Sequence, residues 1–566
     1  MRRCYAALAA LLVAPAALAQ PCAPPTATAE LANAGVRATL FTDGSLFGRR
    51  GQGRYEVPAG SGREALRHAA LWVAGRAAGD AADVRFSGVR DITGGQSEFR
   101  PGPLGPGGAP PADCSAFDRI WRVTLADIAA YNHTGVATAD LAEWPHRLGA
   151  PVVDGDGDPS SYSLAGGDRP ALLGDETAWW VMNDRAGYAP ERPGSSGTAP
   201  VWLEVRVTAF TVSGPYAEQR LGLDAEVAAA LHHATAYRFD LAYRGDVPLE
   251  EAGVGLYVDP DIGGASDDAF GTEAPLAMAY GYNRDAVDEG GYGPRPPAVG
   301  ISLAEAPGGE LTAMYPLFLS LDGGPSPEGL GLSAFGYMLA RWDDDTPVTR
   351  GGDGYNPGSQ DHTRTMFDGR PPAFWSAVNT DGSGRAWQVP DARFVIAVQG
   401  GRWEPGDRAR LTIAVPFAEP LGGASGPAHV TAVNRLLLQA APVVRAVART
   451  IAPDPELATI TPEALPTSGP PPPPAEPEPE LHRAVVAPNP MGAAGAIRLE
   501  LPEPSALRVT VVDVLGRVVA ELDGGERSGA ASVALPALAP GLYVARIEAV
   551  SVSGRRATTR RFTVAR

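Results

Sequence analysis

The chain has 566 residues, of which 44% are hydrophobic, 20% charged and 7% aromatic. This is enough apolar material for packed cores and for about three folded units. The 68 Gly and 55 Pro residues are about twice the usual share, and because both interrupt helices they exclude a helical bundle. All 47 basic residues are Arg, which excludes a P-loop lysine, a pyridoxal Schiff base, a Ser-Lys dyad and the kinase lysine.

The charge is negative and unevenly distributed. The whole chain carries −18, which argues against nucleic acid as a partner, since binding phosphates requires clustered cations. Residues 20–480 hold 34 Arg and 58 acidic residues, a net charge of −24, whereas residues 481–566 hold 11 Arg and 7 acidic residues, a net charge of +4. An acidic body of this kind attracts divalent cations.

The first 19 residues have the pattern of a secretory signal peptide. Arg2 and Arg3 precede an apolar run, Cys4–Ala19, which ends in Ala17-Leu18-Ala19 before Gln20. A membrane anchor is the alternative, but the run is shorter than the ~20 residues that span a bilayer. We therefore expect export through the Sec translocon, a mature chain that begins at Gln20, and no transmembrane segment in it.

Two cysteines remain after this cleavage, Cys22 and Cys114. An exported protein meets an oxidising compartment in which two cysteines tend to pair. We expect a disulfide between them.

The body, residues 20–455, is predicted to be mostly β, with a sandwich-like architecture and few helices. We divide it into a β-rich region at 20–200 and a second at 201–455. A stripe of apolar residues spaced three and four apart indicates one helix at 429–447, packed on a sheet. The strand-like runs, each bounded by Gly, Pro or Asp, are Val201–Phe210, Tyr237–Tyr243, Gly253–Val258, Phe394–Val398 and Arg410–Val415.

A linker and a small tail domain follow the body. Residues 456–480 are rich in Pro and Glu, most densely at 461–480, and predict an extended polyproline spacer, with a ligand for a proline-binding domain as the alternative. Residues 481–566 alternate apolar and polar side chains in short runs separated by turns, which predicts a small antiparallel β-sandwich. The alternating residues are Ile497, Leu499, Leu501, Leu507, Val509, Val511, Leu542, Val544, Phe562 and Val564.

Four blocks of the tail resemble the type A C-terminal sorting domain of the type IX secretion system. They are Ala487-Pro488-Asn489-Pro490, Val512–Val519 with Asp513, Gly516 and Arg517, Leu538–Val544 with Gly541 and Tyr543, and Arg560–Val564. The resemblance implies Sec-dependent entry into the periplasm, transport by the type IX machinery to the outer surface or medium, commonly with removal of the tail, and a surface polysaccharide as a candidate attachment partner. A carbohydrate-binding or adhesive sandwich is the alternative for the same segment.

Scattered parts of the body resemble an uncharacterised family of surface-exported proteins that carry this type of tail. The resembling segments are Val36–Leu46, Ala70–Gly75, Leu173–Trp180 and Tyr257–Asp268. The resemblance implies export and a β-rich body, and it brings no catalytic residues with it.

Two acidic loops are candidate calcium sites, because hard cations take six to eight oxygen ligands in irregular geometry. One contains Asp154, Asp156 and Asp158, but lacks the bidentate Glu of an EF-hand. The other contains Asp259, Asp261, Asp267 and Asp268. Solvated loops are the alternative in both cases.

We find no local catalytic motif among the His, Ser and Cys residues. We therefore expect the body to be a structural or binding module, with a secreted glycosidase-like hydrolase that uses paired carboxylates as the alternative, because acids that meet only in three dimensions leave no motif. Trp179 and Trp180 are adjacent on an expected strand, so we expect one ring in the core and the other partly exposed.

Overall fold

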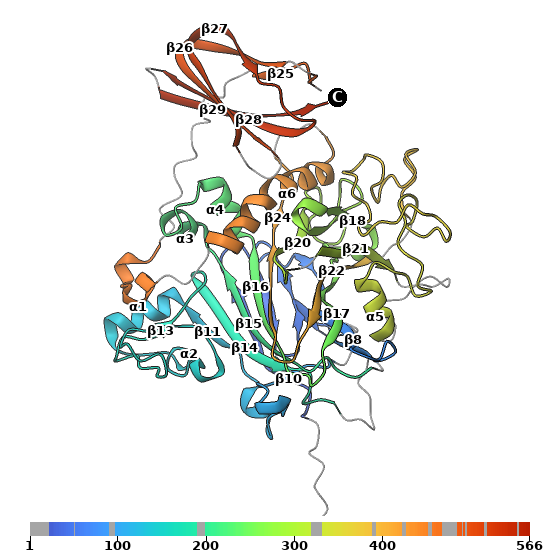
Figure 1. The fold of residues 1–566 in the computed structure, drawn as a ribbon. Coiled ribbons are helices and arrows are strands. Elements are labelled where there is room, and N and C mark those ends of the chain that lie inside the picture. The colour runs from blue at the N-terminus through green and yellow to red at the C-terminus, as the bar shows by residue number, and fades with distance from the viewer. Residues whose placement is uncertain are drawn as a thin grey trace, which may run out of the picture.

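A computed structural model describes residues 22–565 except 50, 90–96, 189–197, 309, 319–330, 388–391, 422–425, 451–454, 467–483, 490, 493–494, 514–517 and 552–553. The predicted signal peptide and most of the Pro-rich segment lie outside these residues. The body is a sandwich of two antiparallel sheets, each with ten strands (Figure 1), so the mostly β fold is confirmed.

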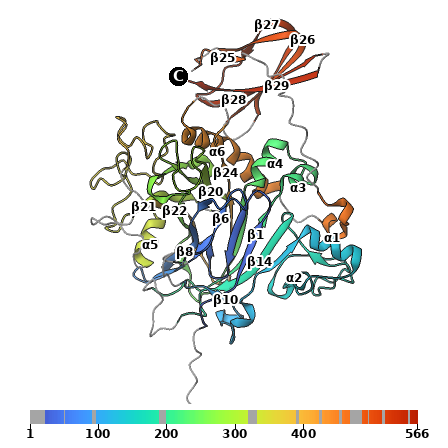
Figure 2. The same cartoon turned by 180° about the vertical axis from the view of Figure 1, so that it is seen from behind.

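The first sheet lies behind the second in Figure 1 and in front in Figure 2. Its main path runs β21-β22-β17-β8-β3-β2-β6-β7, and β1 and β9 pair with β2 and β8. The strands are β1 Thr28–Ala32, β2 Arg37–Phe41, β3 Ser45–Leu46, β6 Tyr55–Glu56, β7 Glu64–Leu66, β8 His68–Ala77, β9 Val84–Gly88, β17 Leu249–Asp259, β21 Glu310–Phe318 and β22 Ala392–Trp403.

The second sheet has the path β10-β14-β15-β16-β23-β20-β19-β18, and β11 and β24 pair with β14 and β20. Its strands are β10 Arg100–Pro101, β11 Trp121–Thr124, β14 Glu176–Asn183, β15 Leu203–Thr211, β16 Thr235–Tyr243, β18 Asp268–Glu273, β19 Met278–Asn283, β20 Ala298–Glu305, β23 Arg408–Val415 and β24 Phe417–Ala418. Two short hairpins lie apart from it: β4 Gly48–Arg49 with β5 Gln52–Gly53, and β12 Val152–Val153 with β13 Arg169–Pro170.

All five strand-like runs of the body are strands in the structure. The boundary at residue 200 separates no structural units, because β14 before it pairs with β15 after it over eight residues. Both regions contribute strands to both sheets. The body is therefore one sandwich, and this follows from pairings between distant segments that local periodicity does not encode.

Helices α1–α4 and the C-terminal end of α6 pack in a hydrophobic core on the outer face of the second sheet, whereas α5 packs against strands of the first sheet. The described helices are α1 Leu125–Thr134, α2 Ala139–Ala142, α3 Gly214–Gln219, α4 Ala225–His232, α5 Gly331–Met338 and α6 Ala428–Arg445. The helix predicted at 429–447 is thus confirmed as α6, which buries Val433, Leu436 and Leu437 among others and continues into a π-helical turn at Ala446–Thr450. Of the described helices, none has the length and apolarity needed to cross a membrane.

Both tryptophans of the Trp179-Trp180 pair are buried, so the expectation of one partly exposed ring was wrong. Trp180 is 0% exposed and lies in the core between the two sheets, whereas Trp179 is 1% exposed and packs in a second core under the helices, against Trp121. The two residues point to opposite faces of β14, as alternation requires. The sequence pattern of one strand does not show that a helical layer covers its outer face.

The tail forms one five-stranded antiparallel sheet, which Figure 1 shows above the body and folded over itself. Its strands are β25 Val485–Ala487, β26 Gly495–Asp513, β27 Val518–Leu535, β28 Gly541–Ser551 and β29 Gly554–Val564. It has its own hydrophobic core, to which all the predicted alternating residues of β26 and β29 contribute. In β28 the buried residues are Tyr543, Ala545, Ile547 and Ala549, one position out of phase with the predicted Leu542 and Val544.

Candidate functional site

The loop between β12 and β13 brings three carboxylates together. Ligand oxygens of Asp154, Asp156 and Asp168 all lie within 4.8 Å of one another, and among the described residues this is the one such group of three metal-ligating side chains. Asp154 and Asp156 are exposed and Asp168 is buried. Oxygens at this spacing are able to contact one cation of calcium's size.

Asp168 is fixed by its own loop. Its Oδ1 accepts a hydrogen bond from the Gly155 N–H at 2.9 Å and its Oδ2 accepts one from the Ser163 N–H at 2.7 Å. Burial raises the pKa of Asp168, but these backbone hydrogen bonds outweigh it and the pKa lies below the ordinary value. The buried carboxylate is therefore charged at neutral pH and is presented as an oxygen ligand.

The predicted third ligand of this loop, Asp158, is placed elsewhere. Its Oδ1 accepts hydrogen bonds from the Ser160 N–H at 3.0 Å and the Ser160 hydroxyl at 2.6 Å, as in an ordinary turn. Asp168 is the third carboxylate of the cluster, in the role that was predicted for Asp158. No fixed spacing pointed to Asp168, because it is brought into the loop by the close approach of Gly155 and Gly167 backbones.

In the second acidic loop, Asp259 is separate from the other carboxylates. It is the last residue of β17, 1% exposed, and its Oδ2 lies 3.5 Å from Nε of Arg393 on the neighbouring strand β22. His68 of β8 is its partner in register on the other side. A buried carboxylate paired with a guanidinium has its charge compensated within the sheet, so we do not include Asp259 in a cation site.

The remaining three acids, Asp261, Asp267 and Asp268, stay near one another. Asp268 opens β18, is 3% exposed, and accepts the Ile262 N–H on Oδ2 at 2.8 Å. Burial raises the pKa of Asp268 well above the ordinary value, and the nearby charges of Asp261 and Asp267 raise it further. No three carboxylates of this loop, as far as the structure describes it, meet the spacing found at Asp154.

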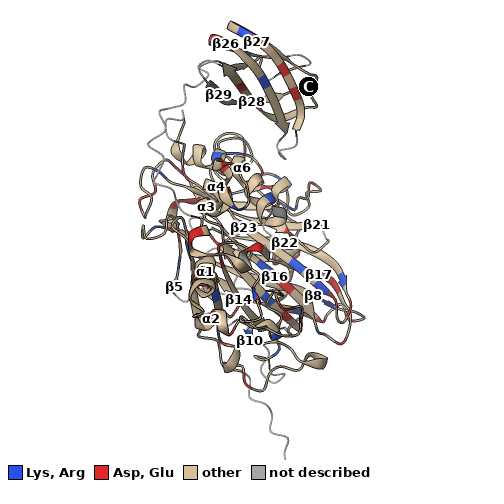
Figure 3. Cartoon of the chain, turned by 90° about the vertical axis from the view of Figure 1, so that its left-hand side faces the viewer, with Lys and Arg blue, Asp and Glu red and all other residues tan. Residues whose placement is uncertain are grey.

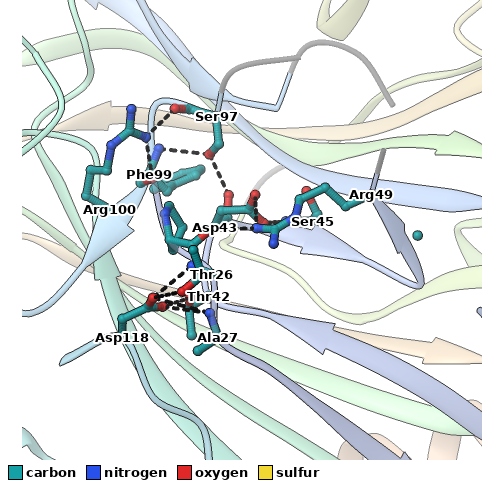
Figure 4. A network of polar contacts seen from close by, with 12 residues as sticks. Thr26, Ala27, Thr42, Asp43, Ser45, Arg49, Ser97, Phe99, Arg100 and Asp118 are labelled. Carbon is teal, nitrogen blue, oxygen red and sulfur yellow. Dashed lines mark hydrogen bonds and ion pairs between the residues drawn. The ribbon is translucent and has the colours of Figure 1, made fainter. Parts of the chain in front are cut away.

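The predicted disulfide between Cys22 and Cys114 is present. It holds the segment that enters β1, and Figure 4 shows the polar network beside it. Asp118 accepts hydrogen bonds from the N–H groups of Thr26 at 2.7 Å and Ala27 at 3.2 Å, and from the Thr42 hydroxyl at 2.7 Å. These contacts attach the N-terminal segment to the first sheet.

Two arginines complete the network in Figure 4. Arg49 donates to Asp43 Oδ2 at 2.9 Å and to the Pro25 carbonyl at 3.3 Å, and Arg100 donates to the Cys22 carbonyl at 3.1 Å. Asp43, Arg49 and Arg100 are at most partly accessible. We interpret this network as structural, because its polar groups hydrogen-bond the backbone of the N-terminal segment at Cys22, Pro25, Thr26 and Ala27.

Motif residues of the tail converge at one end of its sheet. Asn489 Oδ1 accepts the Thr563 N–H at 3.0 Å, and the Tyr543 ring stacks on Phe562 with centroids 5.6 Å apart. The Tyr543 hydroxyl donates to the Ala539 carbonyl at 2.8 Å. Three sorting-type blocks, separated by up to about 75 positions, are thus in contact. Pro488 and Gly541 are exposed at this end, whereas Pro490, Gly516, Arg517 and the Asp513 side chain lie outside the described residues.

The linker begins later than predicted. The Asn132 side chain of α1 donates to the carbonyls of Ala458 at 3.0 Å and Ile460 at 2.8 Å, and Ile460 is 5% exposed. Residues 456–466 are therefore attached to the body, and the rest of the predicted linker lies outside the described residues.

A cavity of about 650 Å³ lies between α4 and α6 of the body and β26 and β28 of the tail. Glu226, Glu273 and Glu548 line it together with Arg370 and Arg546. Because one wall belongs to the tail, removal of the tail removes the enclosure. The cavity therefore gives no support to the alternative of a hydrolase acting with paired carboxylates in a released body.

No family model matches the chain, and no curated protein matches it. One solved structure to which it is similar is a polysaccharide lyase, with 9% sequence identity and a TM-score of 0.19. The match covers 72% of this chain and 36% of the lyase chain, so the chain spans about a third of that protein's length. At this similarity nothing about activity transfers.

Proposed function

We propose that the protein is exported through the periplasm and delivered to the outer surface or medium by the type IX secretion system, with its tail as the sorting signal. The observation that supports this is the convergence of the tail motifs at one end of a sheet with its own core: the first block contacts the last through Asn489 and the Thr563 N–H, and the third contacts the last through Tyr543 and Phe562. The exposed residues at this end, Pro488, Asn489 and Gly541, are the ones that we propose a sorting receptor contacts, with the buried Tyr543 and Phe562 holding them in place.

The body is then the cargo, and we propose that it is a structural or binding module. The net charge of −24 over residues 20–480 and the body's cluster of Asp154, Asp156 and Asp168 fit a module that operates with calcium outside the cell. Figure 3 shows acidic and basic residues interspersed over the body. The two sheets bury the large aromatic residues between and beneath them, which fits a rigid scaffold.

The test is export in a bacterium that has a type IX system, comparing the full chain with a chain that ends at residue 480. The truncated chain should accumulate in the periplasm, folded and with its Cys22–Cys114 disulfide formed. A fluorescent carrier fused to residues 456–566 should reach the outer surface. Secretion of the truncated chain at the full-length level would refute the sorting role.

A point variant separates the motif from the fold of the tail. Asn489→Ala removes two exposed hydrogen bonds, to the Thr563 N–H and the Arg561 carbonyl, each worth about 1 kcal/mol, and should lower export several-fold while the tail still resists protease. Val550→Thr, at an exposed position of β28 outside the four blocks, is the control and should leave export unchanged.

A further inference from the structure

Three oxygen-bearing side chains start from adjacent backbone positions where β18 and β19 meet. Asp268, the first residue of β18, lies directly across from Asn283, the last residue of β19. Asp267 precedes it in a 3-10 turn, Ala265–Asp267, and its carbonyl accepts the Arg284 N–H at 2.7 Å. The junction is closed by backbone hydrogen bonds on both sides.

Each of these side chains has a buried oxygen that receives no hydrogen bond from the described part of the chain. The atoms are Asp267 Oδ2, Asp268 Oδ1 and Asn283 Oδ1. The Asn283 amide nitrogen donates to the Val287 carbonyl at 3.1 Å, and its oxygen is the unsatisfied atom. A buried acceptor without a donor costs about 1–3 kcal/mol, and three such acceptors on two consecutive residues and the register partner of one of them are an environment that a positive partner would stabilise.

The surroundings add negative charge. Asp261, Asp267 and Asp288 all act on Asp268 electrostatically, and Asp268 itself is 3% exposed. The guanidinium of Arg284 donates to the Asp268 backbone carbonyl at 3.1 Å. The Asp268 side chain is thus an acid buried among acids, the environment that a bound cation stabilises.

Asp288 fixes the opposite wall of the junction. Its Oδ1 accepts the N–H groups of Gly264 at 3.1 Å and Gly290 at 2.8 Å, and its Oδ2 accepts that of Tyr292. Gly263 has a φ of +67°, and a Cβ there would lie 2.1 Å from Asp288 Oδ2. The loop is therefore held in one conformation before any ligand binds.

We propose that Asp267, Asp268 and Asn283 bind a calcium ion at the β18–β19 junction, as a site separate from the Asp154 loop and independent of the sorting function. Two carboxylates and an amide carbonyl supply three hard oxygen ligands, and water completes the six to eight that calcium takes. The amide is the third ligand because no third carboxylate of the described loop comes within ligand spacing.

The experiment counts calcium ions bound per chain by equilibrium dialysis of the secreted, calcium-stripped protein. The measurements use an Asp156→Asn background, which removes the other candidate site. This variant should still bind one calcium, and Asp156→Asn/Asp268→Asn should bind one fewer. Asp156→Asn/Glu289→Gln is the matched control, because Glu289 is an exposed acid near Asp267, and it should retain the ion.

Melting in EDTA shows that the variants are folded. Asn at position 268 removes a buried charge, so Asp156→Asn/Asp268→Asn should melt no lower in EDTA than Asp156→Asn alone. Equal calcium binding by these two variants, or no calcium bound by Asp156→Asn, would overturn the proposal.

Discussion

Asp259 and Arg393 lie side by side on neighbouring strands of the first sheet, with Oδ2 and Nε 3.5 Å apart and both side chains at least nine-tenths buried. Val258 and Phe394, the adjacent residues, are partners in register between β17 and β22. The pair places two opposite charges next to each other in the buried part of the sheet.

Removing one member of this pair should be strongly destabilising. Arg393→Met removes the guanidinium beside the buried Asp259 carboxylate, and we expect the free energy of unfolding to fall by about 3–5 kcal/mol. Arg393→Met/Asp259→Asn removes both charges and should recover part of this loss. Denaturant titration of the wild type, Arg393→Met and the double variant measures these free energies of unfolding. A double variant less stable than Arg393→Met would contradict the pairing.

Calcium should raise the melting temperature of the protein by binding to Asp156 and Asp168 of the Asp154 loop, without a contribution from Asp158. Binding to the folded state alone adds about 2.7 kcal/mol when calcium stands at 100 times Kd, and for a large body each kcal/mol moves the melting temperature by about 2–4 °C. Asp156→Asn should lose most of the shift between EDTA and millimolar calcium.

Asp158→Asn is the matched control. It removes the same charge from the same loop, but the Asp158 carboxylate is hydrogen-bonded to Ser160 and lies outside the cluster. It should keep the calcium shift. Equal loss in the two variants would show that the loop acts through its net charge and holds no defined ion.

The disulfide and Asp118 hold the same N-terminal segment, so their contributions should depend on each other. The bridge spans 92 positions, for which chain entropy gives about 4–5 kcal/mol. Because Asp118 still holds Thr26 and Ala27 in its absence, Cys22→Ser/Cys114→Ser should cost less, about 2–4 kcal/mol.

Adding Asp118→Ala to the cysteine-free protein should then cost more than it does with the disulfide intact, since contacts that share one segment are not additive. Denaturant unfolding, with proteolysis of residues 22–27 as the local readout, checks this. Additive losses would mean that the two anchors act independently.

Local sequence patterns correctly predicted individual strands and one helix. The alternation in β15, β16 and β23 and the helical spacing in α6 gave the right elements, because side-chain burial on one face follows periods of two and 3.6. The pairing of Asp259 with Arg393, 134 positions away, and the entry of Asp168 into the Asp154 loop depend on which segments become neighbours. For the same reason the burial of Trp179 could not be predicted from its strand, because the helices that cover this face of the second sheet come from other segments of the chain.

The buried Asp184 carboxyl should make the stability of the protein depend on pH. It is 1% exposed, and its carboxylate accepts hydrogen bonds from the Ser87 hydroxyl at 2.6 Å and from the N–H groups of Trp202 at 2.8 Å and Leu203 at 2.7 Å. Burial raises its pKa to about 6, because desolvation outweighs these hydrogen bonds.

Since the folded state binds this proton more tightly than the unfolded state, Asp184 contributes stability below pH ~4 that is lost as pH rises through about 6. A shift of about two pKa units corresponds to about 3 kcal/mol. Asp184→Asn does not titrate, so the free energy of unfolding of the wild type should fall by about that amount relative to the variant between pH 4 and pH 7. Asp80→Asn, at an exposed turn, should follow the wild type. Unfolding curves of Asp184→Asn that stay parallel to the wild type across this range would show that Asp184 is already ionised at pH 4 in the folded protein.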